Sequence, residues 1–265
     1  MDHPLVPRPP APLQIPTARP GFGAGVAAIF SGIGFIATTP AAWPLAMVPI
    51  AVGVSLSAVF GTLAVKLIPP LFTAWLGGTS GILATTLGVV ATAIALLLGI
   101  LVGFALAQPL SGPALERLVR RAEARDGAPA WPPTSFSDDI LRSLGSLLVS
   151  AAFGLPLLGI LVVISVVFPP AVVVTFPLKL VVLALLVVWD FCDYPLSIRG
   201  LPIRTRVAFM TRNLGAMLGF GLGLALLSLL PCLLFLALPA GVAGAARLVV
   251  AIERAEAGRL GPPRA

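Results

Sequence analysis

The sequence predicts an all-α integral membrane protein, on the basis of its composition and its long segments without charge. Hydrophobic residues make up 58% of the 265-residue chain and charged residues only 10%, and the mean hydropathy is +1.06. Soluble domains typically carry about 25% charged residues. The few charges present cannot cover the surface that a water-soluble fold of this size exposes, so lipid is the solvent the chain requires.

Two segments are predicted to be long transmembrane helices. The first covers residues 45–68 and ends at Pro69-Pro70, and the second covers residues 78–107 and ends at Gln108-Pro109. Each exceeds the roughly 20 residues that a helix needs to cross the hydrocarbon core at a rise of about 1.5 Å per residue. These are the two spans that length and hydropathy predict directly.

Two further apolar regions are predicted to form helical hairpins with proline at or near each tip. They cover residues 143–189, with Pro169-Pro170 at the tip, and residues 214–252, with Pro231 at the tip. Three of the four arms have only about 17 to 21 residues, and three contain an internal proline: Pro156, Pro177 and Pro239. Full crossing and partial insertion both remain open, and partial insertion requires that other helices satisfy the exposed backbone groups.

The rest of the chain is expected to flank or complete a single helical membrane domain covering residues 21–255. Residues 21–39 carry large apolar side chains at three- and four-residue spacing and small residues on the other face. This pattern indicates an N-terminal helix lying at the membrane interface or packed closely on another helix. A short amphipathic helix is expected over residues 113–124. The Pro-rich residues 1–20 are expected to be a disordered cytoplasmic tail, and residues 256–265 a short flexible tail.

The positions of the positive charges predict the topology. If residues 45–68 and 78–107 span, and each hairpin enters and leaves on one side, only Lys66 and Lys179 among the 17 Lys and Arg lie toward the other side. All ten acidic residues then share the charged side as well. The positive-inside rule places that side, with both termini, in the cytoplasm of this multi-pass protein.

Composition argues against several other classes of protein. The single histidine, His3, lies in the Pro-rich tail, and Cys192 and Cys232 lie in no metal-ligand spacing, so we expect neither a metal site nor a catalytic group, and no cofactor. The net charge of +7 comes from basic residues in short loops. Such residues face the anionic headgroups of the lipid bilayer, the partner we expect in place of nucleic acid.

Several motifs in the second half of the chain occur in a specific order. They are Asp193-Tyr194-Pro195, the basic residues Arg204, Arg206 and Arg212, Gly219-Phe220-Gly221, and the segment from Pro239 to Ala245, which includes Gly244. With the order of long spans, charged loop and hairpins, they make residues 21–252 resemble the CysZ-type sulfate permease family, which is grouped with the etoposide-induced protein 2.4 domain. The segment from Pro109 to Glu116 is similar to that family's Pro-Phe-Asn segment.

The resemblance implies a permease of the bacterial inner membrane that forms homo-oligomers. Such a protein passes sulfate into the cell for sulfur assimilation and cysteine biosynthesis, and is not an enzyme. Family members place a segment like Gly-Leu-Arg-Arg before the first long span to hold the sulfate. The corresponding stretch here, residues 40–44, has the sequence Pro-Ala-Ala-Trp-Pro without a basic residue. This departure favours the alternative of a membrane-embedded structural or assembly protein that kept the fold without transport.

Candidate residues for an anion path follow from charge near the membrane. A sulfate dianion needs charge-assisted donors or a helix N-terminus, so Arg204, Arg206, Arg212 and Arg247 are the candidates, although an interfacial anchoring role is open for each. Asp190 and Asp193 are either a pair that couples transport to an ion or interfacial residues bonded to nearby arginines. The glycines Gly219, Gly221 and Gly244 are interpreted as close-packing positions between helices.

Overall fold

The computed structural model describes residues 19–75, 81–132, 136–227 and 231–260, and these residues form helices and no strands. The α-helices, in chain order, are α1 (Phe22–Thr38), α2 (Trp43–Trp75), α3 (Ile82–Leu110), α4 (Gly112–Arg125), α5 (Phe136–Val167), α6 (Val172–Ser197), α7 (Ile203–Arg212), α8 (Leu214–Leu227) and α9 (Pro231–Leu260). Short 3-10 turns, η1 (Pro40–Ala42) and η2 (Pro169–Ala171), precede α2 and α6. The all-α membrane fold is confirmed, and α4 forms where the amphipathic helix was expected.

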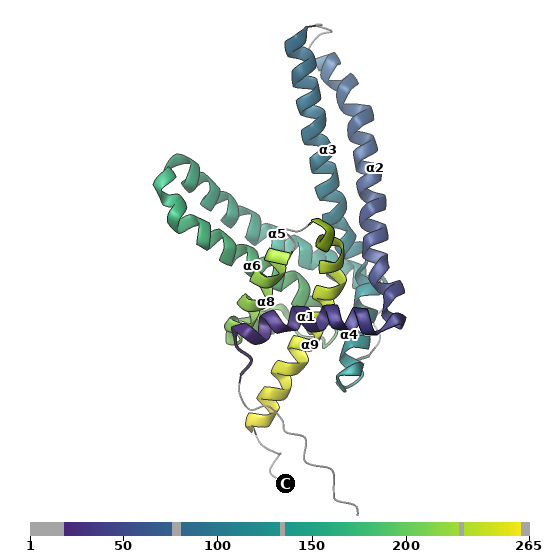
Figure 1. The fold of residues 1–265 in the computed structure, drawn as a ribbon, viewed down its shortest axis with the longest axis vertical. Helices are drawn as coiled ribbons and strands as arrows, with labels where there is room; N and C mark the ends of the chain where they lie inside the picture. Colours follow the sequence, from purple (N-terminus) through teal and green to yellow (C-terminus); the bar gives the residue numbers. More distant parts are fainter. Residues whose placement is uncertain (1–18, 76–80, 133–135, 228–230, 261–265) are drawn as a thin grey trace, which may run out of the picture.

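The two long spans pair as the α2–α3 hairpin, which rises well above the rest of the molecule (Figure 1). The prediction that this helix ends at Pro69-Pro70 is wrong, because α2 continues to Trp75. Each proline removes one backbone hydrogen bond, but an unravelled backbone in lipid would leave many more groups unsatisfied, so the helix persists. Close contact between the arms uses glycine: a Cβ at Gly103 would lie 2.7 Å from the backbone nitrogen of Ser57.

The first Pro-tipped hairpin consists of α5 and α6, with η2 at its tip. The helices extend beyond the predicted residues 143–189, because α5 begins at Phe136 and α6 continues to Ser197. Pro156 and Pro177 lie inside these helices without ending them. The segments Leu144–Val167 and Pro169–Ser197 have 24 and 29 residues and are long and apolar enough to cross a membrane. The hairpin nevertheless leans away from α2–α3, and its tip lies level with the middle of that hairpin (Figure 1).

The lean of α5–α6 leads to a testable expectation on its depth. Phe168 at the tip and Trp75 at the end of α2 both have exposed side chains. In a background with alanine at Cys192 and Cys232, we expect Trp75→Cys to react with a membrane-impermeant maleimide from the far side of the bilayer. We expect Phe168→Cys to be protected from both sides until detergent is added. Labelling of Phe168→Cys from the far side would instead establish full crossing.

The second Pro-tipped region forms a shorter hairpin, in which α8 leads to the break before Pro231 and α9 returns (Figure 1). Helix α8 has 14 residues, about 21 Å at the usual rise, and continues from α7 through a bend of 92°. Within the described residues neither α8 nor α9 is by itself among the helices that could cross a membrane. Helix α9 extends to Leu260, beyond the domain end expected at residue 255.

Helix α1 lies across the foot of the long hairpin and packs on α8 and α9 (Figure 1). Its small residues face these helices: a Cβ at Gly25 would lie 1.9 Å from the carbonyl oxygen of Ala216, and one at Gly32 would lie 2.0 Å from that of Ala240. The large side chains Ile29, Phe35 and Ile36 are buried on the same side, whereas Phe22 and Phe30 are exposed. The prediction that small and large residues occupy opposite faces is therefore wrong in part: the packed face combines glycines with large apolar side chains.

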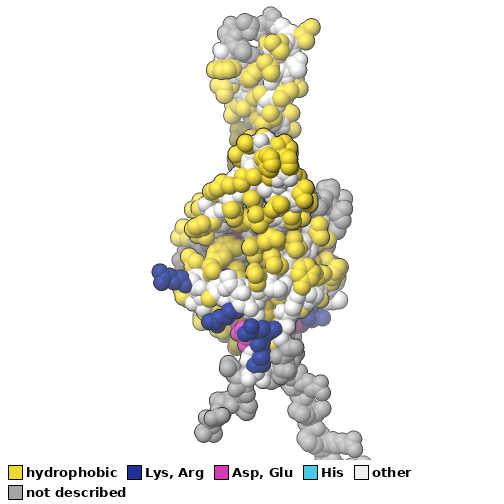
Figure 2. All heavy atoms as spheres, turned by 90° about the vertical axis from the view of Figure 1, so that its left-hand side faces the viewer, with side chains coloured by type: hydrophobic (Ala, Val, Ile, Leu, Met, Phe, Trp, Pro, Cys, Tyr) yellow, Lys and Arg dark blue, Asp and Glu magenta, His cyan; other side chains and the backbone are white. Residues whose placement is uncertain are grey.

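The charged residues gather at the base of the molecule, around α4, α7 and the end of α9. On the face shown in Figure 2, Lys and Arg side chains lie near the lower end of the described part, below a surface that is mainly hydrophobic. This separation of charged base and apolar hairpins is the arrangement expected for a multi-pass membrane protein.

Candidate functional site

Helix α4 is the element that positions most of the buried charges at the base. It begins after Ser111, with Pro113 in its first turn, and its apolar face, which includes Leu115, Leu118 and Val119, is fully buried. The carboxyl groups of Glu116 and Glu123 are buried on the same helix. A buried carboxylate is stable only with hydrogen-bonded cationic partners, and α4 therefore collects arginines around it.

The most buried of these ion pairs joins Arg199 to two glutamates from distant parts of the chain. Arg199 donates from Nη1 to Glu123 at 2.7 Å, and from Nε and Nη2 to the two oxygens of Glu253 at 2.7 and 2.9 Å. The side chains of Arg199 and Glu123 are 3% and 2% exposed. Trp131 donates to Glu123 at 3.1 Å, and its ring lies 5.0 Å from the Arg199 guanidinium. Burial raises the pKa of Glu123, and the charge of Arg199 opposes this shift.

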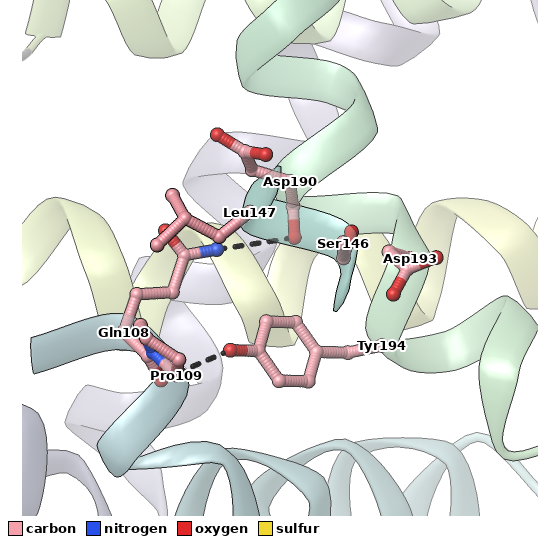
Figure 3. A pocket seen from close by; sticks show the side chains of 7 residues that line it. All are labelled: Gln108, Pro109, Ser146, Leu147, Asp190, Asp193 and Tyr194. Carbon is pink, nitrogen blue, oxygen red and sulfur yellow. Dashed lines mark hydrogen bonds between the residues drawn. The ribbon is translucent and has the colours of Figure 1, made fainter. Parts of the chain in front are cut away.

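The Asp193-Tyr194-Pro195 motif lies at the end of α6 and connects it to α3 and α7. Asp193 forms an ion pair with Arg206, and the hydroxyl of Tyr194 donates to the carbonyl oxygen of Gln108 at 3.2 Å. The Gln108 amide donates in turn to the carbonyl oxygen of Asp190 at 3.3 Å (Figure 3). These contacts lie beside Pro109, another motif residue, and fix the lower ends of two hairpins against each other.

The cavity between these residues is too small for an oxyanion. Its volume is about 10 Å³, which is about the space of one water molecule. The carboxyl groups of Asp190 and Asp193 point in different directions (Figure 3), and Asp193 is neutralised by Arg206. The geometry at Asp193 is that of the interfacial alternative, a carboxylate bonded to a nearby arginine.

Arg247 forms a second bidentate pair, at the junction of α1, α4 and α9. It donates to the two carboxyl oxygens of Asp126 at 2.9 and 3.2 Å and to the carbonyl oxygen of Ser31 at 3.0 Å. Its guanidinium therefore faces a carboxylate at the end of α4 rather than an open polar cavity.

The four arginines selected from the sequence do not come together at one site. Arg206 and Arg247 are paired with different carboxylates. Arg204 and Arg212 have exposed side chains on α7, and among the described residues neither forms an ion pair. Two of the four are thus neutralised, and the other two lie on an exposed helix.

Two other arginines, which are not among the predicted candidates for an anion path, lie at the turn between α1 and α2. Arg121 donates to the carbonyl oxygen of Ala41, and Arg125 donates to the hydroxyls of Thr38 and Thr39 at 3.1 and 2.5 Å. Residues 40–44 lack a basic residue of their own, so α4 supplies two from about 80 positions further along the chain. In the sequence, Arg121 and Arg125 are one helical turn apart on a basic helix, and this spacing indicates that their side chains lie next to each other.

The backbone N–H groups at this turn are mostly in use. Within η1, the N–H of Ala42 donates to Thr39 at 2.8 Å, the N–H of Trp43 donates to Pro40, and Pro40 and Pro44 have no N–H. The N–H groups of Ala42 and Trp43 are therefore in use, and Pro40 and Pro44 offer none. The charged donors near the turn are the guanidinium groups of Arg121 and Arg125, whose side chains are exposed.

The remaining motif residues have structural surroundings. Glu116 accepts from Arg120 at 2.8 Å, and Pro239 is buried in α9. A Cβ at Gly219 would lie 2.1 Å from the Phe22 carbonyl oxygen, one at Gly221 would lie 2.2 Å from that of Ala184, and one at Gly244 would lie 2.6 Å from that of Ala28. These distances agree with the interpretation of the three glycines as close-packing positions.

The residues considered for metal or nucleophilic chemistry do not form a cluster in the described part of the chain. No group of three His, Cys, Asp or Glu residues there has the arrangement of a metal site. Cys192 is buried, with its sulfur 3.9 Å from that of Met217. His3 and the side chain of Cys232 lie outside the described residues.

Comparison with known proteins gives a match to a single family. The family model described as "Sulfate transporter CysZ/Etoposide-induced protein 2.4" matches residues 28–239. No curated protein matches the chain. The matched region begins inside α1, ends inside α9, and includes α4 and the Asp193-Tyr194-Pro195 motif.

Proposed function

Because the chain belongs to the sulfate transporter CysZ/etoposide-induced protein 2.4 family, we propose that it is a permease or channel for a small oxyanion, with sulfate as the first candidate. Within the described residues, four helices are long and apolar enough to cross a membrane, as a multi-pass transporter requires. Under this proposal it moves its solute without a catalytic step, and the imported sulfate would serve cysteine biosynthesis.

The observation that carries the proposal is the pair of arginines at the α1–α2 turn. Arg121 and Arg125 donate to a carbonyl and two hydroxyl oxygens, all of them neutral acceptors. Within the described residues neither is paired with a carboxylate. A sulfate that replaces these acceptors would gain charge-assisted hydrogen bonds from two guanidinium groups, which are the donors best suited to a tetrahedral oxyanion.

The other arginines at the base are less suited to bind a dianion. Arg199, Arg206 and Arg247 each face a carboxylate. An anion approaching them would have to compete with that carboxylate and would leave it buried and unpaired. The turn between α1 and α2 therefore takes the place of the basic segment that residues 40–44 lack.

Under the same proposal, the distribution of arginines predicts how the protein is oriented in its membrane. The charged base, with both termini, would face the cytoplasm of a bacterial inner membrane, because the positive-inside rule favours that side for Arg-rich loops. The α1–α2 turn belongs to this base, so the arginine pair would contact sulfate at the cytoplasmic end of its path. Assembly into a homo-oligomer is part of the proposal, and the apolar sides of α2–α3 and α5–α6 offer surface for it.

The proposal predicts that sulfate uptake depends on Arg121 and Arg125. We expect purified protein in proteoliposomes to take up radiolabelled sulfate saturably and in competition with selenate. The double variant Arg121→Gln/Arg125→Gln should lower uptake by about ten- to a hundredfold, as the loss of one or two charge-assisted hydrogen bonds implies. The matched control, Arg204→Gln/Arg212→Gln, removes the same charge from exposed α7 and should retain most of the activity.

The outcomes separate the two functions that the fold allows. Equal loss in both double variants would show that net charge, and not the turn, governs uptake. No uptake by folded wild-type protein above empty vesicles would contradict the sulfate proposal. It would favour the structural or assembly role, which the absence of basic residues in 40–44 supports.

A further inference from the structure

The two lysines of the chain have unusual positions. Both Lys66 and Lys179 lie within helices long and apolar enough to cross a membrane, and these segments contain no arginine. A cationic side chain in such a segment is costly unless it reaches water or an anionic or polar partner. Each lysine therefore needs water or a partner near its own position, because, among the described residues, the carboxylates of the charged base do not pair with it.

Lys179 has polar partners on both arms of the α5–α6 hairpin. Its ammonium donates to the hydroxyl of Ser165 on α5 at 2.7 Å, and Ser165 lies 2.6 Å from the hydroxyl of Thr175 on α6. Thr175 is buried, 4% exposed, one helical turn before Lys179. Ser165 also donates to the carbonyl oxygen of Leu161 at 2.7 Å, so its oxygen accepts from both Thr175 and Lys179. Ser165 thus holds the ammonium of Lys179, and Thr175 fixes the Ser165 hydroxyl, so the cluster joins the two arms.

This arrangement leaves capacity for an anion. An ammonium group has three N–H donors, and the contact to Ser165 uses one of them. In the described part of the chain Lys179 has no carboxylate partner, and its Nζ makes no other hydrogen bond. The side chains around the cluster on both arms are mainly apolar, with Val166 and Val173 exposed on the outer faces of the hairpin. A charge with two unused donors in such surroundings attracts a counter-anion strongly.

We propose that Lys179, held by Ser165 and Thr175, forms a second oxyanion site within the α5–α6 hairpin, separate from the arginine pair at the base. Its ligand class is a tetrahedral oxyanion, either free sulfate or the phosphate of a lipid headgroup. The tip of this hairpin lies level with the middle of α2–α3 (Figure 1), which places the site away from the charged base. The inference concerns binding, and it does not require the proposed uptake activity.

Lys66 provides an internal control. It is exposed on α2, and the nearby hydroxyl of Thr62, four residues earlier, donates to the carbonyl oxygen of Ala58 at 2.7 Å. Within the described residues Lys66 has no hydroxyl partner. It lines an open, mainly apolar groove with Ser57 and Thr62, but in the described part of the chain it donates to neither hydroxyl. Lys66 thus has the chemistry of Lys179 without the hydrogen-bonded cluster.

The test compares the acetylation rates of the two lysines by peptide mass spectrometry. Purified full-length protein, depleted of lipid in a nonionic detergent, is treated with an acetylating ester in sulfate or in chloride of equal ionic strength. A bound anion holds the amine in its unreactive ammonium form. We expect acetylation of Lys179 to slow about tenfold once sulfate is about ten times its Kd, with the rate at Lys66 unchanged.

A parallel arm identifies the source of the anion. Bicelles with an anionic phospholipid replace sulfate, and neutral bicelles serve as their control. Protection of Lys179 by sulfate assigns the site to a free anion, and protection by the phospholipid alone assigns it to a headgroup; either result supports the inference. No selective protection of Lys179 over Lys66 in either arm would overturn it.

A variant tests the part played by the two hydroxyls. Ser165→Ala/Thr175→Val removes both with little change in volume, and we expect the protection of Lys179 to disappear. The thermal unfolding midpoint of the variant in the same detergent, compared with that of the wild type, reports whether the fold is intact. Protection that persists in the folded variant would overturn the assignment of Ser165 and Thr175. Because the measurement involves no transport, failure of sulfate uptake would leave its result standing.

Discussion

Replacing Arg199 with methionine is expected to lower the free energy of unfolding by about 3–5 kcal/mol, the typical cost of breaking a buried ion pair from one side. Arg199 bonds both Glu123 and Glu253 and is 3% exposed. Without it, Glu123 remains buried with only the Trp131 indole as a donor. Thermal unfolding in detergent at a fixed heating rate would show this as a large drop in the midpoint.

Two companion measurements identify the cause of that loss. Arg199→Met/Glu123→Gln removes the stranded charge and should recover much of the stability. The loss in Arg199→Met should also grow as the pH rises. Burial already raises the pKa of Glu123 above its ordinary value of 4.5, and losing Arg199 raises it further. The folded state then holds a proton that the unfolded chain releases, so stability falls as the pH rises above 4.5, until Glu123 ionises in the folded state as well. A loss independent of pH would contradict this account.

Gly32→Ala is expected to destabilise the protein by about 3 kcal/mol, at the upper end of the usual cost of overpacking. The added Cβ would lie 2.0 Å from the carbonyl oxygen of Ala240 and 2.6 Å from the backbone nitrogen of Gly244. Both are backbone atoms of α9, so no side chain can rotate away. Helix α1 would have to separate from α9, and the unfolding midpoint should fall.

The same helix offers a matched control for this substitution. A Cβ at Gly34 would meet nothing within 4 Å. Gly34→Ala should therefore leave stability unchanged or raise it by up to about 1 kcal/mol, because alanine favours the helix over glycine. Similar destabilisation by both substitutions would show that backbone flexibility in α1, and not its contact with α9, is what matters.

Most of the helical architecture could be predicted from hydropathy and proline positions, because lipid forces backbone groups into helices. The errors concern where helices end. The sequence predicts that the first span ends at Pro69 and Pro70 and that Pro156 and Pro177 interrupt the hairpin arms, yet helices continue through all four prolines. Proline's preference for helix ends is local, and in an apolar segment the backbone has no water to which it could unfold.

The candidate site could be predicted less well, because its contacts join distant parts of the chain. Composition marked Arg206 and Arg247 as cations near the membrane, but not that Asp193 and Asp126 neutralise them. The sequence shows directly that residues 40–44 contain no basic residue. That Arg121 and Arg125 approach this turn depends on the docking of α4 beside α1 and α2, which no local pattern encodes.

The lean of α5–α6 away from α2–α3 also affects the surrounding lipid (Figure 1). In a bilayer whose normal follows α2–α3, the leaflet next to the charged base contains α5–α6, α8–α9, the lower half of α2–α3 and the apolar side of α1. Among the described helices, the opposite leaflet contains only the upper half of α2–α3. The protein then displaces more lipid from one leaflet than from the other and has the shape of a wedge. Such a shape favours membranes curved toward its narrow side, so reconstitution should be more efficient in vesicles whose curvature matches the wedge than in flat bilayers.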